Sequence, residues 1–174
     1  MEKLLKSDVA IVTGAAQGNG AAIARGLARH GAAVAVADVN LDGARETAAM
    51  IEKDGGRAQA FACDVAEREA CEALAIATED AFGPPSILVN NAGILLRGGI
   101  DDGDYEERWR RTLDVNVMGA VNMTMACLPA LRTTKGRVVN IGSIRSFTAD
   151  RSAAAYSASK GAILQMTKAF AVEL

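Results

Sequence analysis

Short runs of valine, isoleucine, alanine and leucine recur along the chain, and turn residues bound each run. Runs that are apolar at every position are typical of strands buried on both faces of a sheet. Between them lie longer, alanine-rich stretches whose apolar residues have helical spacing. The pattern predicts strands at 8–13, 33–38, 57–63, 86–90 and 137–142, and helices at 18–30, 41–54, 67–81, about 104–132, and 153 to the end.

The alternation of strands and helices indicates the topology of the sheet. Strand–helix–strand units have right-handed crossovers and build a parallel sheet. Glycines follow three of the helical stretches, at Gly31, Gly55 and Gly83, as C-terminal stops should. No internal boundary, repeat or low-complexity segment interrupts the pattern, so we expect a single doubly wound α/β domain over residues 1–174.

The composition excludes several other classes of protein. Half of the 174 residues are hydrophobic, which is too many for a disordered chain. The 19 basic and 21 acidic residues give a formal net charge of −2, a balance that makes no case for nucleic acid or an anionic membrane as a partner. No stretch has the roughly 18 uncharged apolar residues of a membrane span. The first 14 residues contain no signal peptide with a small-residue cleavage site.

The three cysteines, Cys63, Cys71 and Cys127, are odd in number and fit no CxxC or zinc spacing. We interpret them as small apolar core residues in a reducing compartment. Together with the N-terminus, this favours a cytoplasmic protein. The acidic run at 101–107 lacks the spacing of a calcium-binding loop, so we expect no metal site.

A glycine-rich turn, TGAAQGNG at 13–20, follows the first predicted strand and opens a helix. The spacing of Gly14, Gly18 and Gly20 is GxxxGxG, which is neither the common GxGxxG fingerprint nor a phosphate loop with its lysine. Glycine permits a tight turn and lets a pyrophosphate approach backbone N–H groups at a helix N-terminus. The turn therefore predicts phosphate binding, with a purely geometric strand-to-helix turn as the alternative.

Asp38 ends the second predicted strand. A carboxylate at this place accepts hydrogen bonds from an adenosine ribose and repels a 2′-phosphate. The nearest positive charge along the chain is Arg45, on the next predicted helix. We therefore favour NAD over NADP. The alternative is that Asp38 caps the turn before that helix, a role that Asn40 could fill as well.

Tyr156 and Lys160 are four residues apart in YSASK, so a helix places them on one face. A free phenol has a pKa of about 10, and a nearby ammonium lowers it by favouring the phenolate. Such a tyrosine is a general acid–base of the kind that hydride transfer needs. The alternative is a surface helix that carries an aromatic residue and a lysine by chance.

Other polar residues stand where the predicted strands and helices would bring them near a ligand. Ser143 ends the fifth strand, and ligands of open α/β sheets lie outside the carboxyl ends of strands, so its hydroxyl could hold a substrate oxygen or merely cap a helix. Asn116 is a poor helix former inside a predicted helix, and it either bonds its own backbone or orders a water chain. Asp64 could cap the next helix or touch an adenine edge, and Gly93 lets a ligand approach the backbone.

Taken together, these segments resemble the short-chain dehydrogenase/reductase family, in the same order and beside the same elements. The matching segments are TGAAQGNG (13–20), Asp38, CDV (63–65), NNAG (90–93), Asn116, Ser143 and YSASK (156–160). The resemblance runs from residue 8 to the last residue. It implies a three-layered Rossmann-type sheet, a nicotinamide cofactor, and hydride transfer between that cofactor and the carbon of a secondary alcohol or ketone.

The resemblance also assigns roles to residues. Tyr156 would be the acid–base, and Lys160 would lower its pKa and bind the nicotinamide ribose. Ser143 would polarise the substrate oxygen, and Asn116 would anchor a water that links Lys160 to solvent. The cofactor-binding residues that it implies are Gly14, Gln17, Gly18, Asn19, Gly20, Asp38, Asp64, Val65, Asn90, Ala92, Gly93, Tyr156 and Lys160.

The sequence departs from the family at two places. Asn19 stands where the family usually has an aliphatic residue. The sequence ends at Leu174 inside the helix that carries Tyr156, whereas the family continues with further strands and a substrate-covering loop. We therefore expect a domain that lacks the final strands of the family fold, either a truncated chain or part of a longer polypeptide, and little catalysis if it ends there.

The partners remain open at this stage. Two rival functions are a non-catalytic NAD-binding module and an oligomerising subunit. The family implies a homodimer or homotetramer through helices 104–132 and 153–174. Arg97 and Arg145 flank the expected substrate mouth and could select an anionic substrate, although solvated surface arginines are the interpretation that we favour. Sugars, acyl-carrier ketones, steroids and small polyols all fit as substrates.

Overall fold

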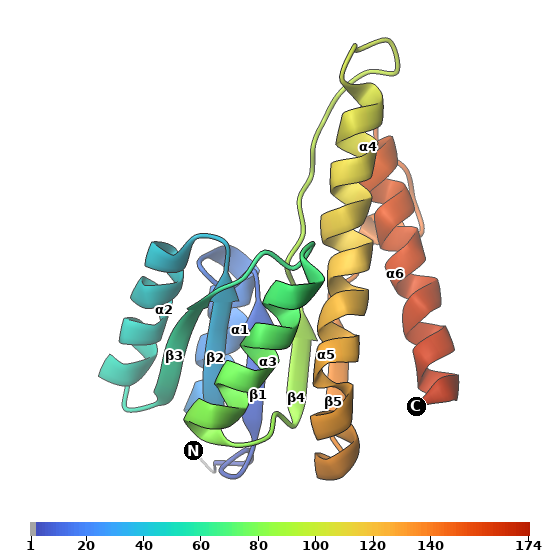
Figure 1. Cartoon of the computed structure of the whole chain (residues 1–174). Helices are drawn as coiled ribbons and strands as arrows, with labels where there is room; N and C mark the ends of the chain where they lie inside the picture. The colour runs from blue at the N-terminus through green and yellow to red at the C-terminus, as the bar shows by residue number, and fades with distance from the viewer. Residues whose placement is uncertain (1–2) are drawn as a thin grey trace.

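The computed structural model describes residues 3–174, which form a five-stranded parallel sheet with helices on both faces (Figure 1). The strand order is β3-β2-β1-β4-β5. The strands are β1 (Val9–Thr13), β2 (Ala33–Asp38), β3 (Arg57–Ala62), β4 (Ile87–Asn90) and β5 (Arg137–Asn140). The predicted doubly wound α/β fold is confirmed; the bounds of β2 match the predicted ones, and those of the other strands differ by one or two residues.

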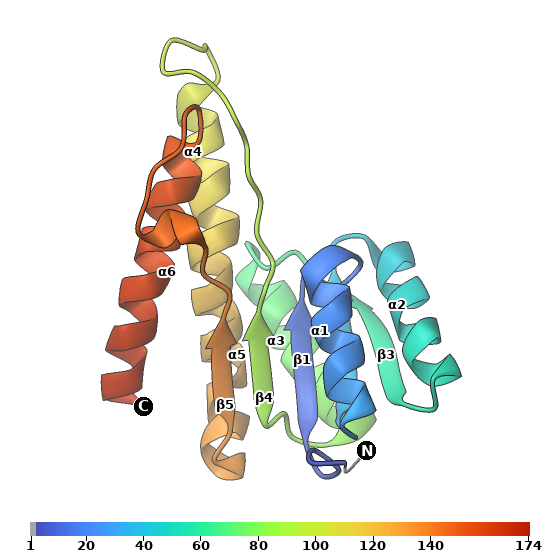
Figure 2. The same cartoon turned by 180° about the vertical axis from the view of Figure 1, so that it is seen from behind.

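Helices cover the two faces unequally, as Figure 2 shows. The helices are α1 (Gly18–Arg29), α2 (Leu41–Lys53), α3 (Arg68–Phe82), α4 (Tyr105–Leu113), α5 (Gly119–Thr134) and α6 (Ala154–Glu173). Helices α1 and α2 lie on one face, over the side of β1 to β3, while α3 and α5 lie on the other. Helix α6 packs beside α4 at the β5 side of the molecule.

The central strands β1, β2 and β4 are apolar at every position before their last residue, because both of their faces are buried. Alternate residues of a strand point to opposite faces. Val12 and Val36 pack into the core under α1 and α2, whereas Ile11 packs into the core under α3 and α5. The three cysteines lie in this second core, buried and free, as predicted.

The predicted helix 104–132 is wrong as a single element. Helix α4 and helix α5 are separated by a π-helical turn at Asp114–Met118, and α5 continues to Thr134. Helical periodicity carries across this turn, so the sequence pattern does not reveal it. Such turns within helices are frequent at functional sites, and Asn116 lies at the middle of this one.

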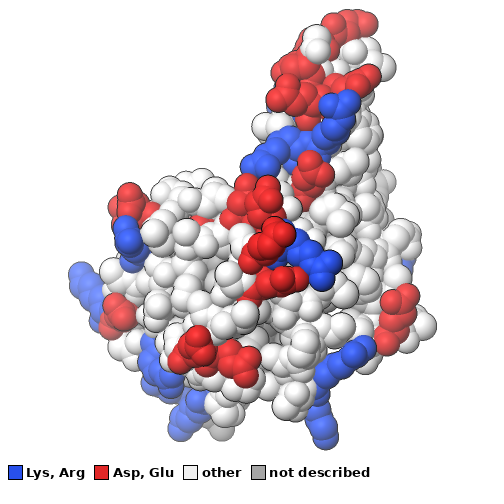
Figure 3. Space-filling model, in the orientation of Figure 1, with Lys and Arg blue, Asp and Glu red and all other residues white. Residues whose placement is uncertain are grey.

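Residues 91–104 run from the end of β4 to the N-terminal end of α4 (Figure 1). Acidic side chains gather around this end of α4 (Figure 3). Two of them, Asp102 and Asp104, form ion pairs with Arg108 of α4, so part of the acidic charge is neutralised where the helix begins. Among residues 3–174, no helix has both the length and the apolarity to cross a bilayer.

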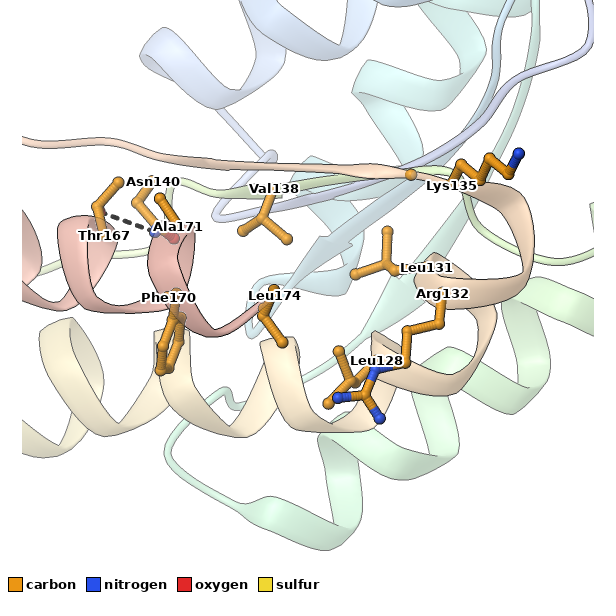
Figure 4. Close-up of a pocket in the computed structure, with 11 residues that line it drawn as sticks. Leu128, Leu131, Arg132, Lys135, Val138, Asn140, Thr167, Phe170, Ala171 and Leu174 are labelled. Carbon is orange, nitrogen blue, oxygen red and sulfur yellow. Dashed lines mark hydrogen bonds between the residues drawn. The ribbon is translucent and has the colours of Figure 1, made fainter.

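The outer part of the β5 side has a hollow of about 510 Å³ between α5, β5 and α6 (Figure 4). Leu131 of α5, Val138 of β5, Phe170 of α6 and the terminal Leu174 line it. A hydrogen bond of 3.0 Å from Asn140 to Thr167 links β5 to α6 beside the hollow. This part of the molecule is therefore packed more loosely than the centre of the sheet.

Candidate active site

The glycine turn joins β1 to α1 in a conformation that only glycine tolerates at two places. Gly14 has φ +63°, and a Cβ there would lie 2.7 Å from the Cα of Ala92. A Cβ on Gly20 would overlap the carbonyl oxygen of Gly14. Both positions bring backbone against backbone, so the glycines are required by close approach as well as by the turn.

The N-terminus of α1 is open toward this turn. Gln17 precedes the helix, and within residues 3–174 its side chain makes no capping hydrogen bond. The first helical bond is donated by the backbone N–H of Ala21 to Gln17, so the N–H groups of residues 18–20 precede it. Free N–H groups and the positive end of the helix dipole suit a phosphate. Gly18 and Asn19 are exposed here, beside the buried Gly20.

Asn91 ties the turn to the end of β4, and the sequence analysis missed it. Its side-chain amide donates to the carbonyls of Thr13 (2.8 Å) and Gly14 (2.9 Å). The Thr13 hydroxyl in turn accepts from the backbone N–H groups of Asn91 and Ala92, both at 3.1 Å. The doubled asparagine of VNNAG was the available signal, but the first asparagine was chosen.

A groove of about 280 Å³ runs along the carboxyl ends of β1, β2, β3 and β4. The predicted residues that line it are Gly14, Gln17, Asp38, Asp64, Val65, Ala92 and Gly93. The sequence analysis did not select its other lining residues, which are Val39, Cys63, Asn91, Ile94, Arg111 and Val115. These residues come from four strand ends and two helices, as expected for a ligand site in an open α/β sheet.

Asp38 is fixed by the backbone at the edge of this groove. One carboxylate oxygen accepts from the N–H of Ala16 and the other from the N–H of Asn40, each at 2.9 Å. The Asn40 side chain, and not Asp38, caps α2 by accepting from Gly43. The nearest cation along the chain, Arg45, turns away to pair with Asp42.

At the far end of the groove, Asp64 makes two contacts. It accepts from the N–H of Ala66 (3.0 Å) and pairs with Arg111 of α4 (3.1 Å). The first contact closes a turn before α3, whose N-cap residue is Glu67, so the helix-capping role that the sequence allowed for Asp64 is wrong. The second brings a cation into the groove that no linear spacing indicated, since Arg111 lies 47 residues further along the chain.

Lys160 is buried beside Tyr156. The residue as a whole is only 6% exposed, and its ammonium donates to the carbonyl of Ile141 at 2.6 Å. Burial lowers the pKa of Lys160 from its ordinary value. The ammonium lies 5.8 Å from the centroid of the Tyr156 ring, so the helix places the two side chains on one face.

The Asn116 side chain holds the segment after β4, and the water chain that the sequence also allowed stays a prediction. Its amide oxygen accepts from the N–H of Ile94 (2.7 Å), and its NH₂ donates to the Ile94 carbonyl and to the Ser159 hydroxyl, each at 2.9 Å. The expectation that it bonds its own backbone is wrong. The π-helical turn aims the side chain sideways from the helix, across to this segment.

A small cavity of about 10 Å³ lies beside these residues, lined by Asn90, Asn116 and Lys160 among others. This is about the volume that one water needs. Asn90 is buried here, where its NH₂ donates to Asn140 and Thr124. Within residues 3–174 its amide oxygen has no hydrogen-bond partner, so the cavity offers an acceptor close to the Lys160 ammonium.

Ser143 follows β5 and caps a short 3₁₀ helix, Ile144–Ser146, by accepting from the N–H of Arg145 at 3.1 Å. The Ser146 hydroxyl accepts from the N–H of Ser143 and donates to the Lys160 carbonyl at 2.8 Å. The capping role is therefore real, and these bonds also fix Ser143 relative to α6. Its own O–H remains a donor at the carboxyl end of the sheet.

Comparison with known proteins finds one family along nearly the whole chain. The sequence model of the family described as short chain dehydrogenase matches residues 8–174. The chain is 38% identical over 172 residues to trans-4-hydroxycyclohexanecarboxylate dehydrogenase of Sinomonas cyclohexanicum, covering 95% of this chain and 66% of that protein. It is 38% identical over 170 residues to D-threitol dehydrogenase of Mycolicibacterium smegmatis, covering 97% and 65%.

A solved structure agrees with this match. The crystal structure of a putative short-chain alcohol dehydrogenase from Sinorhizobium meliloti superposes with a TM-score of 0.92 at 39% identity, covering 97% of this chain and 67% of that one. The chain thus spans about two thirds of the length of the curated relatives that it matches.

Proposed function

The chain belongs to the short-chain dehydrogenase family, and from this premise we propose that it transfers a hydride between a nicotinamide cofactor, NAD in preference to NADP, and the carbon of a secondary alcohol or ketone. The two named relatives act on an alcohol that carries a carboxylate and on a neutral polyol. Both molecules carry a secondary hydroxyl group, and this shared chemistry is the part that we carry to the chain.

The groove at the strand ends fits a dinucleotide. The open N-terminus of α1 and the turn at Gly14 and Gly20 would hold the pyrophosphate, because a side chain at either glycine would fill the space between the turn and its neighbours. Asp38, held by two backbone N–H groups, would accept hydrogen bonds from the adenosine ribose. The same carboxylate would repel a 2′-phosphate, which supports NAD as the cofactor.

Proton transfer falls to Tyr156. Its hydroxyl would take the proton from the alcohol or return one to the ketone oxygen, and the buried ammonium of Lys160 would stabilise negative charge on the phenol oxygen. Ser143, held by its capping bond, would donate to the same substrate oxygen. Asn116 would act at one remove, because its bonds to Ile94 position the wall of the groove.

The burial of the Lys160 ammonium close to the Tyr156 ring carries this proposal. Burying an ammonium is costly unless it is hydrogen-bonded, and the bond of 2.6 Å to the Ile141 carbonyl supplies a partner and fixes the ammonium at the end of β5.

Cofactor titration tests the proposal. When the purified chain is titrated with each cofactor and the fluorescence is followed, NADH should bind at least about tenfold more tightly than NADPH. Asp38→Asn should reduce this ratio of affinities by about tenfold. Asp42→Asn, on the exposed start of α2, is the matched control and should leave the ratio unchanged. Equal or tighter binding of NADPH would overturn the assignment of NAD.

A secondary alcohol is then added together with NAD⁺. Turnover supports the oxidoreductase, and binding without turnover supports the non-catalytic NAD-binding module instead. If neither cofactor binds, an assembly role remains, since Met118 at the end of the π-helical turn and Met125 of α5 are exposed. We propose that α4, α5 and α6 carry the contact of a homodimer or homotetramer, which light scattering on the purified chain would detect.

A further inference from the structure

We propose that the substrate is an anionic hydroxy acid, or the matching keto acid, and that Arg97 and Arg145 bind its carboxylate. The inference rests on the proposed function and names the substrate class for the same site. The observation that carries it is that these two arginines, from segments far apart in sequence, meet at Asp150, which lies in the stretch of chain that links Ser143 to Tyr156.

The two guanidinium groups meet at Asp150. Its Oδ2 atom accepts from Arg97 at 3.1 Å and from Arg145 at 3.0 Å. Asp150 lies about midway along the segment that connects Ser143 to Tyr156, the two residues that would contact the reacting oxygen. Arg97 is exposed at the surface, as expected, and Arg145 is half-buried, but each is paired with Asp150.

Backbone carbonyls hold both arginines in place. The Arg97 side chain also donates to the Arg151 carbonyl at 3.1 Å, and the Arg145 side chain donates to the Ala149 carbonyl at 2.8 Å. A backbone bond of 3.0 Å from Gly98 to the Ser152 carbonyl joins the same two segments. Guanidinium groups fixed in this way lose little freedom on binding a further carboxylate.

The local charge is unbalanced in favour of an anion. Two arginines, Arg97 and Arg145, pair with a single carboxylate, Asp150. The bonds from Arg97 hold the pKa of the Asp150 carboxyl below its ordinary value, so this group is ionised at neutral pH and still leaves the cluster positive. Each guanidinium has five N–H donors, and the one carboxylate uses only some of them. A substrate carboxylate would take the remaining donors and orient the alcohol carbon toward Tyr156.

The test compares two alcohols that differ only in charge. The chain with NAD⁺ is assayed with trans-4-hydroxycyclohexanecarboxylate and with trans-4-methylcyclohexanol, in which a methyl group replaces the carboxylate. The kcat/KM of the acid should be at least about tenfold higher, and the difference should lie mainly in KM. Equal kcat/KM values for the two alcohols would overturn the inference while leaving the proposed function intact.

Arginine variants locate the effect. Arg97→Met and Arg145→Met should each lower the acid-to-neutral ratio of kcat/KM by about tenfold. Arg68→Met removes an exposed arginine that pairs with Glu72 on α3, and it should leave the ratio unchanged. If the arginine variants lower kcat/KM equally for both substrates, the arginines only support the fold and the inference is wrong.

Replacing Asp150 should have the opposite effect on binding of the acid. Because its carboxylate competes for the same donors, Asp150→Asn should lower the KM of the acid several-fold and leave the neutral alcohol's KM less affected. A rise of both KM values would mean that Asp150 is structural and would count against the inference. If neither alcohol is oxidised, calorimetry with cyclohexanecarboxylate and cyclohexanol on the NADH-bound chain decides: anion binding that depends on Arg145 supports the carboxylate site, and no difference overturns it.

Discussion

The two sides of the sheet are built in different ways. In β1 every residue is buried, whereas β5 alternates between exposed and half-buried residues, and its Val139 is 46% exposed. Helices α1 and α2 cover the first side, and the same face has no helix over β5 (Figure 2). The cofactor groove therefore stands on a packed core, whereas the region around Ser143 and Tyr156 is held mainly by polar contacts.

This difference separates two kinds of sensitivity. On the packed side, close backbone contacts determine the shape of the groove. A single added atom there should therefore change both the groove and the stability of the fold. On the polar side, the Asn116–Ile94 bonds, the Ser146–Lys160 bond and the cluster at Asp150 fix positions without a tight core. Changes there should alter chemistry or selectivity more than stability.

The largest expected effect is on the polar side. Tyr156→Phe removes only the hydroxyl, so turnover should fall by roughly 10²–10⁴-fold, while the affinity for NADH and the melting temperature stay close to those of the parent. Steady-state kinetics and NADH titration measure both. Tyr105→Phe, at the only other tyrosine and packed against Trp109, is the control and should keep its turnover. Near-native turnover in Tyr156→Phe would rule out the acid–base assignment.

Gly20→Ala tests the packed side. The new methyl group would overlap the Gly14 carbonyl and approach the Asn91 amide, so the turn must shift, and NADH should bind at least about tenfold more weakly with a loss of about 1–3 kcal/mol in unfolding free energy. Gly26→Ala, two turns along the same helix with open space at its Cβ, should instead stabilise the chain by about 0.5–1 kcal/mol. Urea denaturation and NADH titration of both variants check this, and equal behaviour would contradict it.

The smallest effects compare the two sides directly. Val36→Thr places a hydroxyl in the fully buried centre of β2 and should cost about 1–3 kcal/mol of unfolding free energy. Val139→Thr makes the same change on half-exposed β5 and should stay within about 0.5 kcal/mol. Similar losses in urea denaturation would show that β5 is as well packed as β2.

Most of the fold follows from the sequence because the central strands are uninterrupted apolar runs, as Val34 and Val36 illustrate, and because glycines end the helices. The π-helical turn could not be predicted, since helical periodicity continues through Val115 and Met118. The spacing of apolar residues indicates which face of a helix is buried. It does not indicate where one extra residue is inserted into the helix.

The candidate site was predictable in so far as it lies on local motifs. The glycine turn, Asp38 and the pair Tyr156 and Lys160 have spacings with a physical meaning. Contacts between distant segments were not predictable, and Asn91, Arg111 and the meeting of Arg97 with Arg145 at Asp150 all depend on such contacts. Charge alone could not tell a paired arginine from a solvated one.

The hydrogen bonds between Asn91 and the glycine turn have a consequence for the order in which the chain folds during synthesis. Its hydrogen bonds join residues 77 and 78 positions apart, and β1 gains its second neighbour only when β4 arrives. Long-range contacts of this kind form late because a large loop must close first. A ribosome-bound chain that has emerged only as far as β3 therefore contains the residues of the glycine turn without the contacts that shape it, and the proposed cofactor could not assist folding before β4 is released.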